Sequence, residues 1–512
     1  MSITHNIIAD PSTGRFDSRN PLGRFIPLPA KIEGLTFVSR TTTSLAFSWT
    51  ADANATGYNV YVNSEPTPRM TGATGTQTTL SGLSTDSSFN IRVSGVNTAG
   101  EGPKSDPVTM TTSAVVDEEN GWFVSTAGSD SNAGTLASPF LTIQRAFEAV
   151  QPGDTIYIRA GTYLVSGRIF VPVSGTEANP ITMQGYPGED KPLFVFNSGQ
   201  TCQLDTPRDG FRLVSINHWR FKGFAVTNAC YMGFLIENSN SNIFENLTLY
   251  ANNSSGMQFY RTCNNNKVIN CDSFNNADLR TDGNGGDGFS AKYGSGTGNE
   301  YIGCRAWHCS DDGWDFFSWT GGIKLTNCWA FWCGIDVWGI GSAFRGAGNG
   351  FKLGGNLRPA PHVLVNCITF GMKEARAGLG FRQNTNTAGM YFYHCLGWDC
   401  KRNWNLGPKQ GDAVHTVINS VNHDGDIREW EPGTILINNT WDLGITLTSS
   451  DFESLTQTLA TAERLADGSL PRVALLRPVA SSPLVDQGIA ISGLDRDFLG
   501  AAPDIGPFEF GD

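Results

Sequence analysis

Four short segments of the chain repeat a glycine, an aromatic residue and then a residue of changing chemistry. They are Gly288-Phe289-Ser290, Gly313-Trp314-Asp315, Gly350-Phe351-Lys352 and Gly380-Phe381-Arg382. Two positions before the aromatic, the first three copies carry Asp287, Asp312 and Asn349. If the segments stack on one another, they place a column of carboxylates beside a column with one lysine and one arginine. Such an arrangement could hold a cation next to a general base.

A second repeat indicates that the segments do stack. A cysteine, any residue, a small residue and an aromatic follow one another at five places, which begin at Cys271, Cys304, Cys328, Cys367 and Cys395. The intervals between these copies are unequal, but all of them fit a unit of roughly 24 residues with insertions, a length typical of repeat architectures. Because the units are rich in short β-type runs and Gly/Asn turns, we predict a parallel β-solenoid with like positions about 4.8 Å apart.

The two repeats share one frame. Asp287 precedes Cys304 by nearly the same interval as Asp312 precedes Cys328. Since successive side chains of a strand point to opposite faces, the four aromatics are expected to point inward. The residues that follow them are expected to point out to solvent: Ser290, Asp315, Lys352 and Arg382.

Four aspartates gather in this frame: Asp287, Asp311, Asp312 and Asp315. The last three of them are close neighbours in the chain. Without a positively charged partner, the four carboxylates would repel one another. We interpret the group as a metal site. The alternative left open by the sequence is a structural ladder of Asn/Asp turns.

Composition restricts the kind of partner. The chain has 512 residues, 59 of them glycine, and a formal net charge of −12, which argues against nucleic acid as a partner. A bound cation can invert the local field, so an acidic substrate is not excluded. No apolar run approaches the length of about 20 residues that spans a bilayer. The first residues lack a basic segment followed by an apolar one, so we expect no secretory signal peptide.

All eleven cysteines lie between residues 202 and 400, and none has the C-x2-C spacing typical of zinc sites. Most of them occupy repeat positions. We expect them to be mainly reduced, buried side chains that pack as small hydrophobes. Disulfides or metal ligation remain open for the others.

The chain divides by pattern into an arm or linker (residues 1–30), a first domain (31–114), an acidic linker (115–120) and a second domain (121–512). In the first domain, alternating strands at 44–49, 57–62, 78–80 and 89–96 predict a small antiparallel sandwich. With Trp49, Tyr58 and the run 97–103, this domain resembles a fibronectin type III domain. The resemblance allows either glycan or surface binding, or a rigid spacer.

The second domain is expected to be all-β, a parallel β-helix with a short amphipathic helix at 143–150 that caps the first coil and another short helix within 453–466. It resembles the family 9 pectate lyases, which are right-handed parallel β-helix enzymes, at 286–289, 310–317 and 349–355. The family's calcium aspartates map onto Asp287, Asp311, Asp312 and Asp315, and its catalytic lysine onto Lys352. The resemblance implies Ca²⁺-dependent β-elimination on a 4-linked uronic-acid polymer such as pectate.

Further side chains are candidates for the same site. Lys292 is a second possible base, although a solvated lysine is the simpler interpretation. Arg382 is either a clamp for a substrate carboxylate or a partner for Asp315. Trp319 and Trp338 are candidates for sugar stacking, and the insertion 334–348 is expected to shape the cleft.

Two other functions share the predicted fold. A polygalacturonase-type hydrolase would use paired acids and would not need Lys352. A phage tail-spike depolymerase or adhesin would act on a bacterial capsule or exopolysaccharide. The protein is accordingly expected to be extracellular or virion-associated, and a monomer or a spike-like homotrimer.

Overall fold

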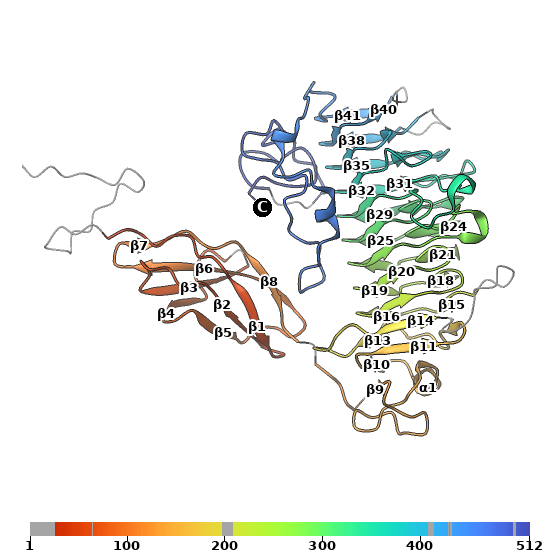
Figure 1. Ribbon diagram of the computed structural model, residues 1–512, viewed down its shortest axis with the longest axis horizontal. Helices are drawn as coiled ribbons and strands as arrows, with labels where there is room; N and C mark the ends of the chain where they lie inside the picture. The colour runs from red at the N-terminus through yellow and green to blue at the C-terminus, as the bar shows by residue number, and fades with distance from the viewer. Residues whose placement is uncertain are drawn as a thin grey trace, which may run out of the picture. The chain divides into compact units, whose positions relative to one another are not determined.

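The computed structural model describes residues 26–511, except 64, 114, 120, 197–207, 408–413, 429, 431–432 and 495–497. It contains two compact units, which divide between Val116 and Asp117 (Figure 1). The N-terminal arm expected at 1–30 lies outside the described residues, apart from 26–30. No helix in the described part of the chain is long and apolar enough to cross a membrane.

The first unit is an antiparallel sandwich, as predicted. Its three-stranded sheet contains β1 (Thr36–Arg40), β2 (Ser44–Ser48) and β5 (Gln77–Ser81). Its five-stranded sheet contains β3 (Gly57–Val62), β4 (Met70–Ala73), β6 (Ser88–Asn97), β7 (Gly100–Glu101) and β8 (Val108–Thr111). Buried side chains from both sheets, among them Phe47, Trp49 and Val60, form one core.

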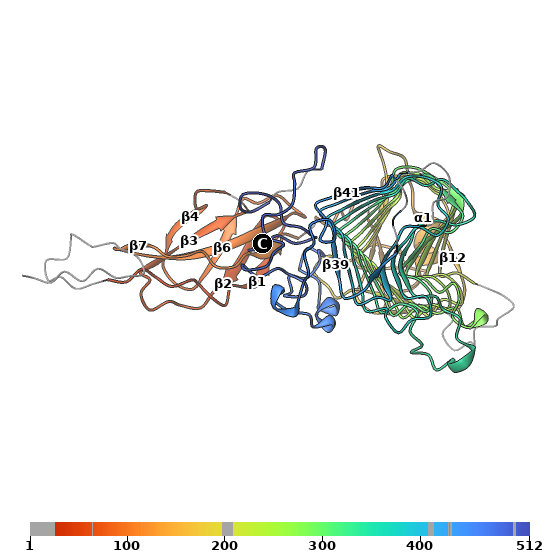
Figure 2. The same ribbon diagram turned by 90° about the horizontal axis from the view of Figure 1, so that it is seen from above.

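The second unit is a parallel β-helix with three long sheets, each of which takes one strand from successive coils. The strands stack from β9 at one end to β41 at the other, and the coils superimpose when seen from above (Figures 1 and 2). This architecture confirms the predicted all-β solenoid, and the insertions between strands explain why the cysteine spacings are unequal.

The bounds of the strands are as follows. The 12-stranded sheet contains β9 (Gly121–Val124), β10 (Thr155–Ile158), β13 (Ile181–Gly185), β16 (Trp219–Lys222), β19 (Ile243–Glu245), β22 (Lys267–Ile269), β25 (Asn299–Ile302), β29 (Ile323–Thr326), β32 (Val363–Val365), β35 (Tyr391–Tyr393), β38 (Thr416–Ile418) and β41 (Ile435–Ile437). The 10-stranded sheet contains β11 (Thr162–Val165), β14 (Leu193–Phe196), β17 (Ala225–Thr227), β20 (Thr248–Tyr250), β23 (Asp272–Phe274), β26 (Arg305–Trp307), β30 (Trp329–Phe331), β33 (Ile368–Phe370), β36 (Leu396–Trp398) and β39 (Val421–His423). The 11-stranded sheet contains β12 (Ile169–Phe170), β15 (Phe211–Val214), β18 (Phe234–Glu237), β21 (Met257–Thr262), β24 (Phe289–Ser295), β27 (Trp314–Asp315), β28 (Trp319–Thr320), β31 (Asn349–Lys352), β34 (Leu379–Arg382), β37 (Arg402–Asn405) and β40 (Asp426–Ile427).

Helices are few and short. The helix expected at 143–150 is α1 (Ile143–Ala149), which is capped by the side chain of Thr142 and lies at the β9 end of the stack. Its buried Phe147 packs edge-on against Trp219. The helix expected within 453–466 is only a 3₁₀ turn, η4 (Gln457–Thr461). The remaining 3₁₀ turns are η1 (Leu279–Thr281), η2 (Gly341–Ala343) and η3 (Ser449–Asp451).

The interior of the β-helix is built from ladders of identical or similar residues. The aromatics that follow the repeated glycines stack ring on ring, with centroids 5.1 Å apart for Phe289 and Trp314 and 4.9 Å apart for Trp314 and Phe351. Nine cysteines in the described ranges are buried thiols, as predicted, whereas Cys230 forms a disulfide. These ladders fix the rotation of each coil, and therefore which side chains reach its outer surface.

Candidate active site

The outward-facing column predicted from the repeat is present in the 11-stranded sheet. Ser290 pairs with Asp315 between β24 and β27, Asp315 with Lys352 between β27 and β31, and Lys352 with Arg382 between β31 and β34. The aromatic before each of these residues is fully buried. The order Ser, Asp, Lys, Arg therefore runs along the helix axis, one residue per coil.

The glycines before the aromatics have a steric cause. A Cβ atom at Gly313 would lie 2.7 Å from the carbonyl oxygen of Gly350 in the next coil, and a Cβ at Gly288 would lie 2.7 Å from that of Gly313. Only glycine allows the coils to approach this closely at the start of each strand. The same close approach at Gly233 and Gly256 extends the repeat to earlier coils. These two glycines belong to the same repeat, which was predicted to begin only at Gly288.

The expectation that this column faces solvent is wrong for two of its members. Ser290 is 0% exposed and Asp315 is 1% exposed, whereas Lys352 and Arg382 are half-buried. Alternation along a strand correctly indicated which face these side chains occupy. It could not show that Lys292 and Lys352 lie against the Asp315 carboxylate and cover it.

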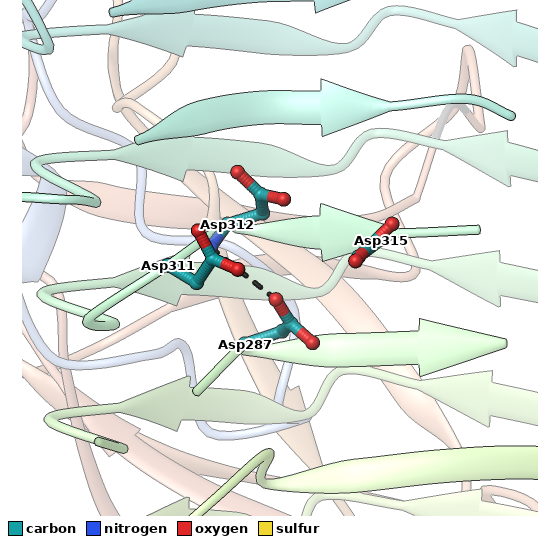
Figure 3. A group of neighbouring side chains, drawn as sticks. All are labelled: Asp287, Asp311, Asp312 and Asp315. Atoms are coloured by element: carbon teal, nitrogen blue, oxygen red, sulfur yellow. Dashed lines mark hydrogen bonds between the residues drawn. The ribbon is translucent and has the colours of Figure 1, made fainter. Parts of the chain in front are cut away.

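The four aspartates form one buried cluster. Potential ligand oxygens of Asp287, Asp311, Asp312 and Asp315 all lie within 4.8 Å of one another. Figure 3 shows that Asp311 and Asp312 precede β27, that Asp315 lies on this strand, and that Asp287 belongs to the coil of β24. The interval between Asp287 and Asp311 along the sequence thus becomes a separation of one coil in space.

One column of this cluster is also a turn ladder, the alternative interpretation left open by the sequence. The backbone N–H of Asp312 donates to Oδ1 of Asp287 at 3.3 Å (Figure 3), and the backbone N–H of Asn349 donates to Oδ1 of Asp312 at 2.9 Å. Ser255, which sequence reasoning missed, donates its hydroxyl to Oδ2 of Asp287 at 3.0 Å. Each side chain in the column holds the next coil in place, so the structural and chemical roles coexist.

Asp311 is held by the backbone of two insertions. Its Oδ2 accepts the N–H of Gly285 at 2.8 Å, and its Oδ1 accepts the N–H of Ala347 at 2.7 Å. The longer insertion, 334–348, leaves the coil through Gly334 and Gly348. Both glycines have φ near +70°, and a Cβ at Gly334 would lie 2.2 Å from the Cα of Gly348. The insertion 334–348 therefore contacts the site through Asp311, and its shaping of the cleft stays a prediction.

Two lysines are paired with the aspartates. Lys292 Nζ lies 2.7 Å from both Asp287 Oδ2 and Asp315 Oδ2. Lys352 Nζ lies 3.1 Å from Asp312 Oδ2 and 3.0 Å from Asp315 Oδ2. The interpretation of Lys292 as a solvated lysine is wrong, because its side chain is only 12% exposed and makes two ion pairs.

The cluster shifts the pKa values of its members in opposite directions. Burial, strengthened by neighbouring carboxylates, raises the pKa of Asp287 to about 6 and that of Asp311 to about 8. Burial also opposes ionisation of Asp315, but Lys292 and Lys352 lower its pKa below the usual value. For Lys352 burial favours the neutral amine, yet the surrounding aspartates raise its pKa above the usual value.

The charge and the unused oxygen of the cluster fit a divalent cation. When all four aspartates are ionised, as ligands of a metal must be, they and the two lysines carry a formal charge of −2. Oδ1 of Asp315 is buried and has no hydrogen-bond partner among the described residues. Hard carboxylate oxygens are the ligands that Ca²⁺ prefers. The residues present therefore suit the calcium site implied by the family resemblance.

The structure distinguishes the three remaining candidates, Arg382, Trp319 and Trp338, by their burial and their contacts. Arg382 makes no ion pair within the described ranges, and its Nη1 reaches only Oδ1 of Asn349 at 3.5 Å, so it is not the partner of Asp315. Trp319 is fully buried and cannot stack on a sugar, which makes that prediction wrong. Trp338 is half-buried and stacks on Phe344 within the insertion.

A cleft of about 620 Å³ opens over the cluster and is lined by Asp311, Asp315 and both lysines. Four aromatic residues that sequence reasoning missed complete much of its wall: Tyr231, Tyr260, Tyr293 and Phe317. None of them belongs to the glycine or cysteine repeat, so no periodic signal marked them. A chain of sugar rings could lie in such a groove with one ring next to the aspartates and lysines.

Comparisons with known proteins agree with this fold. Residues 122–419 match the family model "Pel9A-like, right handed beta helix region", and residues 30–111 match the fibronectin type III domain. Pectate lyase L of Dickeya dadantii is 34% identical over 399 residues, which cover 76% of this chain and 90% of the relative. The crystal structure of pectate lyase Pel9A is similar with a TM-score of 0.70 and 32% identity, over 77% of this chain and 98% of that one. A rhamnogalacturonan lyase structure is similar with a TM-score of 0.59 and 26% identity, over 70% of this chain and 96% of that one.

Proposed function

The chain belongs to the Pel9A-like right-handed β-helix family and is a polysaccharide lyase, and we propose that it cleaves a 4-linked uronic-acid polymer of the pectate type by Ca²⁺-dependent β-elimination. The observation that carries the proposal is the cluster of four buried aspartates and two lysines, of which Asp311, Asp315 and both lysines line one cleft. The N-terminal unit of the chain is a fibronectin type III domain, for which we propose the bounds 31–114 and the role of a spacer.

The substrate chemistry explains why this set of residues suffices. In a 4-linked uronate, the proton at C5 lies next to a carboxylate and is acidified by it. A base removes this proton, electrons shift toward C4, and the glycosidic oxygen at C4 leaves with the electron pair of the C4–O bond and takes up a proton from the protonated base or from solvent. The C4–O bond breaks, a C4–C5 double bond forms, and no water is consumed. Elimination therefore needs a base and stabilisation of the charge that develops on the uronate.

Lys352 is the proposed base. Its amine is held 3.1 and 3.0 Å from two carboxylate oxygens and lines the cleft, so it faces the place where a uronate would lie. Lys292 sits closer to its carboxylates, at 2.7 Å to each, and its shorter ion pairs favour a structural or substrate-binding role. Asp312 and Asp315 orient the Lys352 side chain through these contacts.

The proposed ligands of the cation are Asp287, Asp311, Asp312 and Asp315. When bound there, Ca²⁺ would neutralise the substrate carboxylate and stabilise the negative charge that develops as the C5 proton is removed. The chain's own contribution is to fix the carboxylates: backbone N–H groups hold Asp311 and Asp312, and Ser255 holds Asp287.

Arg382 is the proposed clamp for a second substrate carboxylate. It lies one coil beyond Lys352 in the same column and has no carboxylate partner among the residues that the structure describes. Neighbouring coils are about 4.8 Å apart, so Arg382 lies one such step beyond Lys352 along the helix axis. A polymer that lies along the helix axis could thus present one carboxylate to the aspartate cluster and a further one to Arg382.

Pectate is the default substrate, and an acidic bacterial capsule or exopolysaccharide is the alternative. Polysaccharides of this type occur outside cells, so we place the enzyme outside the cell or on a virion. For its oligomeric state we propose a monomer or a homotrimer. The test is a panel of polymers: polygalacturonate, rhamnogalacturonan, alginate and an acidic capsule, each with Ca²⁺ or with EDTA. Ultraviolet absorbance of unsaturated products that EDTA abolishes supports the proposal. New reducing ends without this absorbance would indicate hydrolysis and refute it.

A further inference from the structure

At one corner of the β-helix, five successive coils hold a residue in the left-handed backbone conformation. It lies one residue after Glu237, Tyr260 and Lys292, which pair in register in the 11-stranded sheet. Arg261 and Tyr293 lie within β21 and β24, where Arg261 pairs with Gly294, so the register shifts by one residue at Tyr293. In chain order, the residues at the corner and their φ angles are Ser215 (57°), Asn238 (50°), Arg261 (59°), Tyr293 (52°) and Ser318 (58°). On these five coils the geometry of the corner imposes a positive φ on residues of quite different type.

Tyr293 is poorly suited to this corner. A positive φ is tolerated by Asn and disfavoured for bulky side chains. The same corner holds asparagine at Asn238, serine at both ends of the column, and Arg261, which is held by an ion pair with Glu237. Tyr293 is 59% exposed, so burial contributes little to offset the unfavourable backbone. Backbone strain of this kind tends to occur at functional sites.

The ring of Tyr293 lines the cleft. It lies edge-on to Phe317, with ring centroids 5.6 Å apart and planes at 75°. Phe317 in turn lies 5.6 Å from Nζ of Lys352, measured to the ring centroid. The two rings form a continuous aromatic surface that leads from the proposed base to the edge of the cleft.

We propose that Tyr293 is a substrate-binding platform, on which the apolar C–H face of a sugar packs next to the sugar whose proton Lys352 removes. The inference rests on the proposed function. An aromatic ring offers contact area without charge. It can hold the ring of a neighbouring sugar whether or not that sugar's carboxylate reaches the cation or Arg382. The wall residue Phe317 supports the ring from its side.

The test uses the full chain with Tyr293→Asn and Tyr293→Phe, and Tyr391→Asn as a matched control. Tyr391 is a 40% exposed tyrosine on β35 of the 12-stranded sheet and does not line the cleft. For Tyr293→Asn on polygalacturonate with Ca²⁺, we expect KM to rise about tenfold, the effect of losing one aromatic contact. Since Asn suits a positive φ, the melting temperature should stay the same or rise. Tyr293→Phe should keep a KM within twofold of the wild type, as should Tyr391→Asn.

Two results would overturn the inference. One is a KM of Tyr293→Asn within twofold of the wild type. The other is a rise in KM together with a clear fall in melting temperature, because this would show that the ring is structural. Both differ from failure of the proposed function, in which the wild type itself would release no unsaturated product from any uronan.

Discussion

Lys292 and Lys352 lie 2.7 and 3.0 Å from the same oxygen, Oδ2 of Asp315. One buried carboxylate therefore joins two ammonium groups from different coils, while its other oxygen, Oδ1, has no hydrogen-bond partner in the described part of the chain. Asp315 thus connects the proposed base, the second lysine and a free ligand atom. The proposed base and the proposed calcium ligands are therefore coupled through one side chain.

Replacement of Lys352 should abolish turnover without abolishing binding. For Lys352→Ala we expect kcat to fall by a factor of about 10² to 10⁴, the usual contribution of a general base, with affinity for polygalacturonate largely kept. Initial rates from ultraviolet absorbance and binding by isothermal titration calorimetry measure the two effects. Lys324→Ala, on the exposed side of β29, is the control and should behave as the wild type. If Lys292→Ala lost the larger factor in kcat and Lys352→Ala did not, the two lysines would have to exchange roles.

Asp315→Asn should weaken binding of Ca²⁺. The variant loses one anionic ligand and leaves Lys292 and Lys352 with less negative charge around them, which increases repulsion of a cation. We expect the Ca²⁺ concentration for half-maximal activity to rise by at least about tenfold, and the stabilisation of the folded protein by added Ca²⁺ to shrink. Thermal melts with and without Ca²⁺ test this independently of activity. Asp190→Asn, at an exposed position, is the control. An unchanged Ca²⁺ response in Asp315→Asn would contradict the assigned ligand set.

Activity should rise with pH. Only the neutral amine of Lys352 can accept a proton, and the aspartates raise its pKa, so the neutral fraction is small at pH 7 and grows about tenfold per pH unit below that pKa. We therefore expect an alkaline optimum and a slope near 1 in a plot of log kcat/KM against pH on the acidic side. Rates measured between pH 5 and 10 at saturating Ca²⁺ give this slope and the pH optimum. A flat profile over this range would count against Lys352 as the base.

Arg382→Ala should impair binding of acidic substrate selectively. A charge-assisted hydrogen bond contributes about 1.5–3 kcal/mol, so KM on polygalacturonate should rise roughly 10- to 150-fold. On highly methyl-esterified pectin, which has few free carboxylates, the variant and the wild type should have similar KM values if both cleave it. Arg382→Lys should recover part of the loss, because it keeps the charge but not the planar fork. An equal loss on both polymers would argue for a structural role.

The buried ion pair of Arg305 and Asp272 should stabilise the attachment of the C-terminal segment around Ala460 to the β-helix. Arg305 is 3% exposed, contacts both oxygens of Asp272, and donates at 2.8 Å to the backbone carbonyls of Ala460 and Ala462. Arg305→Met leaves a buried carboxylate without this partner, and we expect a loss of about 3–5 kcal/mol in the free energy of unfolding. Denaturant unfolding measures the loss. The double variant Arg305→Met/Asp272→Leu should be less destabilised than Arg305→Met alone, and a larger loss in the double variant would contradict this explanation.

Much of the site could be predicted because the repeat is local. The interval between Asp287 and Asp311 equals one coil, and alternation along a strand aligns Asp315, Lys352 and Arg382 without any knowledge of the rest of the chain. The resemblance to family 9 pectate lyases added the chemistry. Exposure was predicted less well. Lys292 and Asp315 were expected at a solvated surface, yet each contributes to the burial of the other.

The amino-acid sequence by itself determined the coil, its period and the column of chemically distinct residues, since strand alternation and repeat spacing are properties of consecutive residues. Only the tertiary structure decided how the charges pair, that the backbone of two insertions holds Asp311, and that Tyr293 and Phe317 form the wall of the cleft. The physical reason is that insertions of unequal length obey no period. Their course depends on contacts between coils, and so do the burial and pKa values of the side chains that they cover.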